Sequence, residues 1–333
     1  MTLRMLVLGG TSWLGGAVAR HALERGHRVT CLARGESGEV PAGAELVVAD
    51  RWQGDPYAEV RRSWDAVLEV SWQPELVRAA VEALGATHWV YVSSASVYAD
   101  DTVPNCDESA PRHPGWQGSG VADVEDYGPA KVACEDVVVA GTASHTLVRP
   151  GLIVGYGDRS DRFGYWPARF ARVATPEERV LSCRRDASCQ VIDAEDLARW
   201  LVDCAEDRVG GHFNAVGDPM PLGSVLDLCA EAARTLAVLA PATDAWLAEQ
   251  GVAPWAGEES LPLWLPQPEY AGFMTRTNQA AKDAGLRLRP LVETAESALR
   301  WEEEQGLDRP RRAGLTPARE RALLGKLIGE STR

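Results

Sequence analysis

Short apolar runs alternate along the chain with longer segments whose apolar residues recur at helical spacing. The first run, 5–8, is followed by a glycine-rich turn and then by Leu14, Val18, Ala22 and Leu23 on one helical face. Strands that alternate with helices form a parallel sheet with helices on both faces, so we expect an α/β fold with a doubly wound parallel sheet. The expected strands are 5–8, 29–32, 45–49, 66–70, 89–92 and 146–148, with a turn at 63–65, and the expected helices include 14–25, 74–84 and 127–140.

The first strand–helix turn reads LGGTSWLGG, residues 8–16. In doubly wound sheets this turn lies at the carboxyl edge, where the free N–H groups of the helix N-terminus bind phosphate. Gly9 would allow the tight turn, and Gly15 would let the helix approach the strand. A glycine cluster can also be a plain loop, but its place between the first strand and helix favours a dinucleotide site. The expected contacts are Gly9, Thr11, Ser12, Trp13, Leu14 and Gly15.

The pentapeptide YGPAK, residues 127–131, places a tyrosine and a lysine four residues apart on an expected helix. Residues at this spacing share one helical face. An ammonium beside a phenol stabilises the phenolate, which suits a proton donor to a carbonyl oxygen. The alternative is an exposed tyrosine and lysine on an ordinary helix.

The composition limits the kinds of partner that the chain is expected to bind. The chain of 333 residues has 45% hydrophobic and 25% charged residues, as ordinary globular proteins do. A net charge of −14 argues against a nucleic-acid partner, although not against a nucleotide in a local pocket. The seven cysteines form no CxxC pair and have no metal-ligand spacing, which suits a reducing cytosol and no metal site.

The N-terminus has features of a secretory signal, namely Arg4, an apolar run and the small residues 17–19. The run is cut at once by Gly9 and Gly10, however, and no later stretch approaches the ~18 apolar residues of a membrane span. We therefore expect a soluble cytoplasmic protein without a membrane partner.

Five motifs occur in one order: the glycine turn, YVSSASVYAD at 91–100, YGPAK, RPGLIVG at 149–155 and VIDAEDLA at 191–198. Over roughly residues 3–305 the chain resembles the extended short-chain dehydrogenase/reductase superfamily, of the NAD(P)-dependent epimerase/dehydratase type. The resemblance implies a Rossmann domain at 1–155, with further sheet elements near 190–216, and a smaller substrate-binding lobe within 156–333. It makes Tyr127 the catalytic acid/base, Lys131 the residue that holds the nicotinamide ribose, and Ser94 the hydroxyl that binds the reacting oxygen. Ser93 would be structural, and Ser71 and Pro150 would also contact the cofactor.

The chain departs from the family pattern at three places. Ser12 replaces a glycine and could offer its hydroxyl to a phosphate. The fourth strand ends in EVSW, where Trp72 either narrows the site or simply packs. Ala95 and Ser96 stand where sugar dehydratases carry an Asp-Glu pair, so we expect reduction, oxidation or epimerisation rather than water elimination.

The expected lobe contains two long irregular segments, 156–173 and 253–276, which at this length are usually functional lids or disordered. Arginines match phosphate and carboxylate groups, although salt-bridged surface arginines are the alternative. Thr316 and Pro317 should begin a last helix that docks on the body or on a second subunit, which would make a homodimer. The expected substrate contacts are Trp72, Ser96, Arg159, Arg162, Tyr165, Trp166 and Arg276.

The end of the second strand indicates the cofactor. Ala33 stands where NAD-binding relatives carry an acid for the ribose hydroxyls, and Arg34 follows it. Arg34 could bind a 2′-phosphate, so NADP(H) is preferred and NAD(H) remains possible. Asp50 should lie near the adenine, with Arg51 beside it. Three functions stay open: an NADPH-dependent reductase of a small or sugar-like carbonyl compound, a nucleotide-sugar epimerase, and a non-catalytic protein that binds RNA or a regulator.

Overall fold

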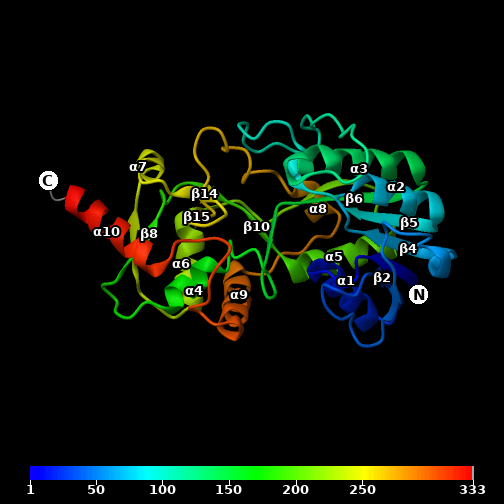
Figure 1. The fold of residues 1–333 in the computed structure, drawn as a ribbon, viewed down its shortest axis with the longest axis horizontal. Helices are drawn as coiled ribbons and strands as arrows, with labels where there is room; N and C mark the ends of the chain where they lie inside the picture. The colour runs from blue at the N-terminus through cyan, green and yellow to red at the C-terminus, as the bar shows by residue number, and fades with distance from the viewer. Residues whose placement is uncertain (332–333) are drawn as a thin grey trace.

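The structure is a computed structural model that describes residues 1–331. Its centre is a parallel sheet in the order β11-β6-β5-β4-β1-β2-β3 (Figure 1). This arrangement confirms the predicted doubly wound α/β fold. The strands are β1 (Arg4–Leu8), β2 (Arg28–Ala33), β3 (Glu45–Val48), β4 (Ser63–Glu69), β5 (Gly85–Val92), β6 (His145–Pro150) and β11 (Gly211–Ala215).

Residues 63–65 were predicted to form a turn but instead begin strand β4. Ser63 and Trp64 pair in register with Gly85 and Ala86 of β5. The Trp64 ring is buried against the sheet, and its Nε1 donates a hydrogen bond to Val60 O at 3.0 Å. Burial of this large ring therefore extends the strand beyond what the local turn-like residues indicate.

Helices cover both faces of the sheet because alternate residues of each buried strand point to opposite sides. Met5 and Val7 pack toward helices α1 (Trp13–Glu24) and α5 (Ala194–Asp207). Leu6 and Leu8 of the same strand pack toward the other face, where α2 (Pro74–Ala83) and α3 (Tyr127–Gly141) lie. Figure 1 shows α2 and α3 on one side of the sheet and α1 and α5 on the other.

The strand order reverses at β1. From β1 the chain builds β2 and β3 on one side, and β4, β5 and β6 on the other. The turns that leave β1 and β4 therefore run in opposite directions and leave a crevice at the carboxyl edge, where ligands of such sheets bind.

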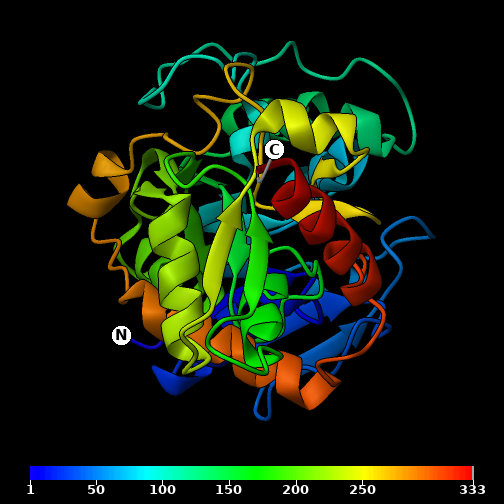
Figure 2. The same ribbon diagram turned by 90° about the vertical axis from the view of Figure 1, so that its left-hand side faces the viewer.

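The remaining elements form a smaller lobe, at the left of Figure 1 and facing the viewer in Figure 2. Its core contains Trp166, Phe170, Leu226 and Trp264. Both segments that were expected to be irregular contain regular structure, namely one helix and a pair of strands. The lobe elements include α4 (Tyr165–Ala171), β8 (Arg179–Ser182), α6 (Leu222–Ala232), β13 (Val238–Pro241), α7 (Asp244–Glu249), β14 (Ala253–Trp255), β15 (Ser260–Pro262), α9 (Leu291–Gln305) and α10 (Pro317–Ser331).

Short elements connect the lobe to the sheet. Strand β7 pairs in parallel with β10, and β9 pairs antiparallel with β12. After β10 the chain returns to the sheet as α5 and β11. These connecting elements are β7 (Leu152–Val154), β9 (Ser188–Cys189), β10 (Val191–Asp193), β12 (Met220–Pro221) and α8 (Gln279–Asp283).

Helix α10 packs on the lobe of its own chain. Thr316 caps it as predicted, since its Oγ1 accepts a hydrogen bond from Arg319 N at 3.2 Å. Glu320 is buried and accepts a hydrogen bond from Arg169 Nε at 2.5 Å, and Leu323 is also buried. Within residues 1–331, no helix combines the length and the apolar character needed to cross a membrane.

Candidate active site

Two cavities lie along the carboxyl edge of the sheet. The larger, of about 700 Å³, is lined by Ser94, Tyr127 and Lys131 among others. The smaller, of about 400 Å³, lies beyond the ends of β1 and β2. Ser12 and Val70 line both cavities, so the two meet at the crevice between β1 and β4.

The glycine turn between β1 and α1 brings the backbone close to these cavities. Gly9 has φ +91°, a backbone conformation that favours glycine. A Cβ on Gly15 would lie 2.3 Å from Gly9 O, so only glycine fits at position 15. Ser12 caps α1: its Oγ accepts from Gly15 N at 3.2 Å and donates to Gly9 O at 2.7 Å. The hydroxyl hydrogen of Ser12 is therefore used inside the turn. The first N–H groups of α1, at Trp13 and Leu14, are the ones left for a phosphate.

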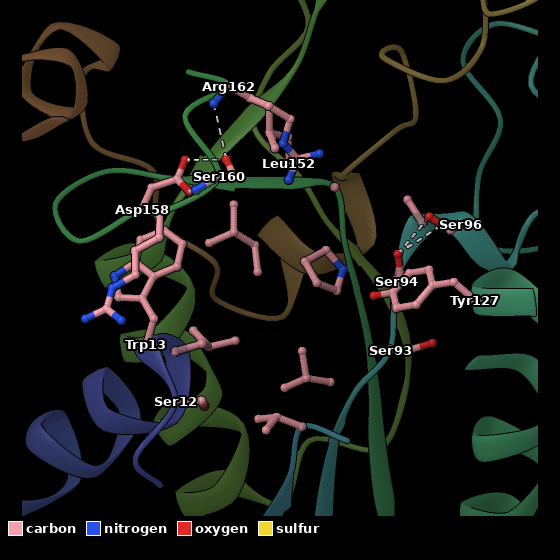
Figure 3. A pocket seen from close by; sticks show the side chains of 18 of the residues that line it. Ser12, Trp13, Ser93, Ser94, Ser96, Tyr127, Leu152, Asp158, Ser160 and Arg162 are labelled. Carbon is pink, nitrogen blue, oxygen red and sulfur yellow. Dashed lines mark hydrogen bonds between the residues drawn. The ribbon is translucent and has the colours of Figure 1, made fainter. Parts of the chain in front are cut away.

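Helix α3 presses directly against the segment that follows β5. A Cβ on Gly128 would lie 2.5 Å from Ser96 O, so the glycine after Tyr127 permits this close approach. Ser94 Oγ accepts from Ser96 N at 3.1 Å and donates to Ser96 Oγ at 3.1 Å. In Figure 3, Tyr127, Ser94 and Ser96 occupy one side of the cavity.

Lys131 lies one helical turn beyond Tyr127 and is only 2% exposed. Its Nζ donates to Val92 O at 2.6 Å, Ser71 O at 3.1 Å and Val70 O at 3.4 Å. An ammonium has three hydrogens, so the carbonyl of Val92 at the end of β5 and those of Val70 and Ser71 just after β4 satisfy all of them. The result is a buried positive charge behind Tyr127. To bind a ribose hydroxyl, Lys131 would have to give up one of its three carbonyl partners. Val70 O is the one expected to be exchanged, because its hydrogen bond is the longest.

The opposite side of the larger cavity is the loop 155–162, with Asp158 and Arg162 (Figure 3). Trp13 Nε1 donates to Tyr156 O at 2.8 Å and ties this loop to α1. Burial raises the pKa of the Asp158 carboxyl, and its hydrogen bonds from Ser160 oppose that rise. Burial lowers the pKa of the Arg162 guanidinium, while Asp158 and Tyr127 act in the opposite direction. Arg162 therefore lies within electrostatic range of the tyrosine.

Four of the predicted substrate contacts lie at the cavities. Ser96, Arg159 and Arg162 line the larger one. Trp72 lines the smaller one, where its ring packs against Tyr127 with centroids 5.5 Å apart.

The other three predicted substrate contacts, Arg276, Tyr165 and Trp166, line neither cavity, so the structure does not support these predictions. Arg276 is 1% exposed, donates to Asp101 Oδ1 at 2.8 Å and lies 4.0 Å from the centroid of the Tyr98 ring. Tyr165 and Trp166 begin α4 and turn into the lobe core. Arg276 connects the lobe to the sheet domain, and the rings of Tyr165 and Trp166 pack in the hydrophobic core of the lobe.

The smaller cavity contains the predicted adenosine contacts. Arg34 stands at its rim with 59% of its side chain exposed, 3.3 Å from Glu36. Asp50 accepts hydrogen bonds from Trp52 N at 3.0 Å and Gln53 Nε2 at 2.9 Å.

Arg51 also lines the smaller cavity, but its guanidinium is already engaged. It donates to both oxygens of the buried Glu69, at 2.9 and 2.5 Å. It also donates to Tyr57 Oη at 3.0 Å. Arg51 therefore contributes to the wall of the cavity and offers no free charge to a ligand.

Five residues that line the lobe side of the larger cavity with polar, charged or aromatic side chains were not predicted from the sequence. They come from segments far apart in the chain. Four of them lie in the two long segments that the sequence marked as unusual, 156–173 and 253–276, whereas Arg312 carried no such signal. Arg312 reaches the cavity because its backbone N donates to the buried Asp161 at 2.7 Å. The missed residues are Asp158, Ser160, Trp255, Phe273 and Arg312.

The crevice, the glycine turn and the Ser-Tyr-Lys group define the class as nucleotide-binding proteins of Rossmann fold. Residues 53–215 match the NAD dependent epimerase/dehydratase family. The matched segment, 163 of the 333 residues, contains Ser94, Tyr127 and Lys131.

Individual proteins resemble parts or all of the chain. The 2'-dehydrokanamycin reductase of Streptomyces kanamyceticus is 28% identical over 236 residues, which cover 66% of this chain and 63% of that protein. The chloroplast stem-loop binding protein of 41 kDa b of Arabidopsis thaliana is 28% identical over 171 residues, 46% of this chain and 42% of that protein. The match thus spans less than two thirds of either relative. The Bordetella bronchiseptica enzyme WbmH, solved in complex with NAD+, has the same fold, with TM-score 0.66, 16% identity and coverage of 92% of this chain and 100% of that one.

Proposed function

We propose that the chain is an NADP(H)-dependent oxidoreductase that reduces a carbonyl group on a small or sugar-like metabolite. The observation that carries the proposal is the buried Lys131 behind Tyr127, with Ser94 in the same cavity. These groups converge at the carboxyl edge of the sheet, where one substrate oxygen could meet both hydroxyls.

The residues at the crevice fit a dinucleotide. The glycine-only contact at Gly15 and the first N–H groups of α1 form a cradle for pyrophosphate. Ser71, Lys131 and Pro150 lie at the cavity walls where a ribose and a nicotinamide would follow.

Bound NADPH would supply the hydride to the carbonyl carbon. Ser94 would redirect its hydroxyl hydrogen from Ser96 Oγ to the carbonyl oxygen and orient it. Tyr127 would give its proton to the same oxygen, which completes the alcohol, and would regain a proton from water. Lys131 would stabilise the phenolate that remains, because its positive charge is held in a site with little water.

The preference for NADP(H) follows from the rim of the smaller cavity. Ala33 places no carboxylate against a 2′-phosphate, and Arg34 stands beside it. The partner of Arg34, Glu36, is itself 67% exposed, so their ion pair is weak and the guanidinium is available. Asp50 would lie near the adenine.

The larger cavity favours a substrate that carries a phosphate or carboxylate. Arg159, Arg162 and Arg312 line it, and Asp158 is the carboxylate among its lining residues. Within residues 1–331, the Arg162 guanidinium has no hydrogen bond or ion pair and stacks 5.0 Å from the Trp255 ring centroid. A partly buried cation in this situation gains most from an anionic ligand.

Two alternatives remain. A nucleotide-sugar epimerase, as the family description suggests, would use the same groups through a transient ketone, would hold its cofactor tightly and would show no net redox. A non-catalytic binding protein is suggested by the name of the stem-loop binding relative. The net charge of −14 and the complete Ser94, Tyr127 and Lys131 group weigh against RNA binding by this chain.

The test is a panel of carbonyl compounds with and without phosphate or carboxylate groups, followed by NADPH absorbance. Mass spectrometry of small molecules that co-purify with the protein accompanies the panel. NADPH oxidation with an anionic carbonyl compound supports the reductase. Stoichiometric co-purified NAD(P) without net oxidation supports the epimerase, and the absence of both favours a binding protein. In either function we expect a cytosolic protein, which suits its free cysteines, and a homodimer is the oligomeric state we would test first.

A further inference from the structure

The turn between β4 and α2, residues 70–73, lies directly behind the proposed catalytic pair. The carbonyl oxygen of Ser71 accepts hydrogen bonds from Lys131 Nζ at 3.1 Å and from Tyr91 Oη at 3.0 Å. The Ser71 N–H donates to Glu69 Oε1 at 2.8 Å. Ser71 is therefore fixed by hydrogen bonds with Glu69 and Tyr91, and its carbonyl oxygen binds the ammonium of Lys131.

Gln73, at the other end of the turn, holds the loop that leads to Tyr127. Its Nε2 donates to Ala122 O at 3.1 Å, and its Oε1 accepts from Ala122 N at 2.8 Å. Gln73 is 8% exposed, so this double hydrogen bond is shielded from water. Five residues after Ala122 the chain begins α3 at Tyr127.

Trp72 stands between these two anchored residues and contacts Tyr127 itself. The ring centroids are 5.5 Å apart and the planes are tilted by 59°, a favourable geometry for aromatic pairs. Trp72 lines the smaller cavity and Tyr127 lines the larger one. The indole therefore supports the phenol from the dinucleotide side and leaves the substrate side open.

We propose that Trp72 is a positioning residue that holds the Tyr127 ring in the orientation needed for proton transfer. Ser71 and Gln73 fix the turn on both sides of Trp72, so the indole itself has little freedom. Ser71 thus contacts Lys131, Trp72 contacts Tyr127, and Gln73 contacts the loop before Tyr127. The catalytic importance of this positioning rests on the proposed function, whereas the ring contact does not.

The first experiment needs no substrate. The protein is labelled with 3-fluorotyrosine, and the Tyr127 signal among its seven tyrosines is assigned by Tyr127→Phe. We expect the fluorine resonance of Tyr127 to shift and broaden in Trp72→Ala, because the ring current is lost and the phenol samples more orientations. Trp72→Phe should retain a sharp signal. An unchanged Tyr127 resonance in Trp72→Ala overturns the proposal.

The second experiment uses the best carbonyl compound from the panel. Trp72→Ala should lower kcat about 10-fold and change KM less than about threefold, since the loss concerns the transition state. Trp72→Phe should restore most of kcat. A shifted resonance with unchanged kcat also overturns the positioning role. If the wild-type protein reduces no compound, the reductase proposal fails, and the resonance experiment still decides whether Trp72 orients Tyr127.

The control is Trp246→Ala. Trp246 is also half-buried, but it lies on α7 in the lobe, and its Nε1 donates to Glu330 at 2.7 Å. We expect it to leave both the Tyr127 resonance and kcat unchanged. If Trp72→Ala does not fold, as judged by thermal melting, Trp72→Leu fills most of the volume without an aromatic ring and provides the same readout.

Discussion

Lys131 shows how one residue can be both buried and charged. A lone ammonium in a protein interior is unfavourable unless its hydrogens are bonded. Here one carbonyl of β5 and two carbonyls of the turn after β4 accept its hydrogen bonds, and the Tyr91 ring lies 4.9 Å away. Because the acceptors are backbone carbonyls rather than side chains, the charge stays in one place. Tyr127 lies one turn earlier on the same helix.

Tyr127→Phe should abolish turnover and leave dinucleotide affinity nearly unchanged, because only the proton donor is removed. The measurements are kcat on the panel substrate and the dissociation constant for NADPH. A variant that keeps more than about a tenth of the wild-type kcat, a loss below ~1.4 kcal/mol, would contradict the role. Lys131→Ala is the companion variant, and it should weaken both cofactor binding and rate.

Arg34→Ala should remove most of the preference for NADPH and leave NADH affinity almost unchanged. We expect the wild-type protein to prefer NADPH by about 10-fold or more, or at least ~1.4 kcal/mol. Dissociation constants for the two cofactors are measured by fluorescence titration. Equal constants in the wild-type protein would refute the preference. Arg61→Ala is a suitable control, since Arg61 is paired to Asp55 at the surface and lines neither cavity.

At the scale of elements, α3 carries a polar stripe on its inner face. Tyr127, Lys131 and Glu135 follow one another at four-residue spacing, and Glu135 is completely buried. Arg149 of β6 donates to both Glu135 oxygens at 2.8 Å. Burial alone would raise the pKa of Glu135, but the hydrogen bonds and charge of Arg149 outweigh it and lower the pKa. One helix thus joins the larger cavity to a buried ion pair deeper in the fold.

Strand β5 contains a group that makes stability depend on pH. His88 is fully buried between Ser144 Oγ and Thr146 Oγ1, both at 2.8 Å, and burial lowers its pKa to about 4. The unfolded chain, with a histidine pKa near 6.5, binds this proton first. Stability is therefore complete above about pH 6.5 and falls as the pH drops toward 4, by at most ~3 kcal/mol for this group.

Urea unfolding of wild-type protein and His88→Gln across that pH range tests the prediction. The free energy of unfolding should fall less steeply in His88→Gln. A part of the slope will remain, because burial also lowers the pKa of His145 and His212. Parallel slopes for the two proteins would assign the pH dependence to other groups.

At the scale of the whole molecule, two cores meet at the candidate site. The sheet domain supplies the glycine turn and α3, and the lobe supplies Arg162, Trp255 and Arg312. Arg276 joins the parts: it comes from the lobe side of the chain and lies over Tyr98, which follows the Ser94–Ser96 segment. Tyr98 Oη in turn donates to Asn214 of β11 at 2.6 Å and accepts from Arg149 at 3.0 Å.

Arg276→Met should destabilise the protein by about 3 kcal/mol, because it removes a buried cation from Asp101 and from the Tyr98 ring. Urea unfolding followed by tryptophan fluorescence measures the loss, and separate transitions for the two parts would show that they have become uncoupled. Arg61→Met is the control: Arg61 and Asp55 are 54% and 51% exposed, so the change should cost less than about 1 kcal/mol. Equal losses in both variants would mean that Arg276 does not couple the two parts.

The sequence by itself determined the parallel sheet, the glycine turn and the placement of Ser94, Tyr127 and Lys131 at one edge. These features depend on neighbours within a few residues, namely strand–turn–helix order and the four-residue spacing on a helix. Tertiary structure decided the rest. Arg276, Tyr165 and Trp166 appear suited to substrate in the sequence but are buried, whereas Asp158, Trp255 and Arg312 line the cavity. No local pattern separates these two groups, because tertiary packing decides the direction of each side chain, as the contacts of Arg276 with Asp101 and of Arg312 with Asp161 illustrate.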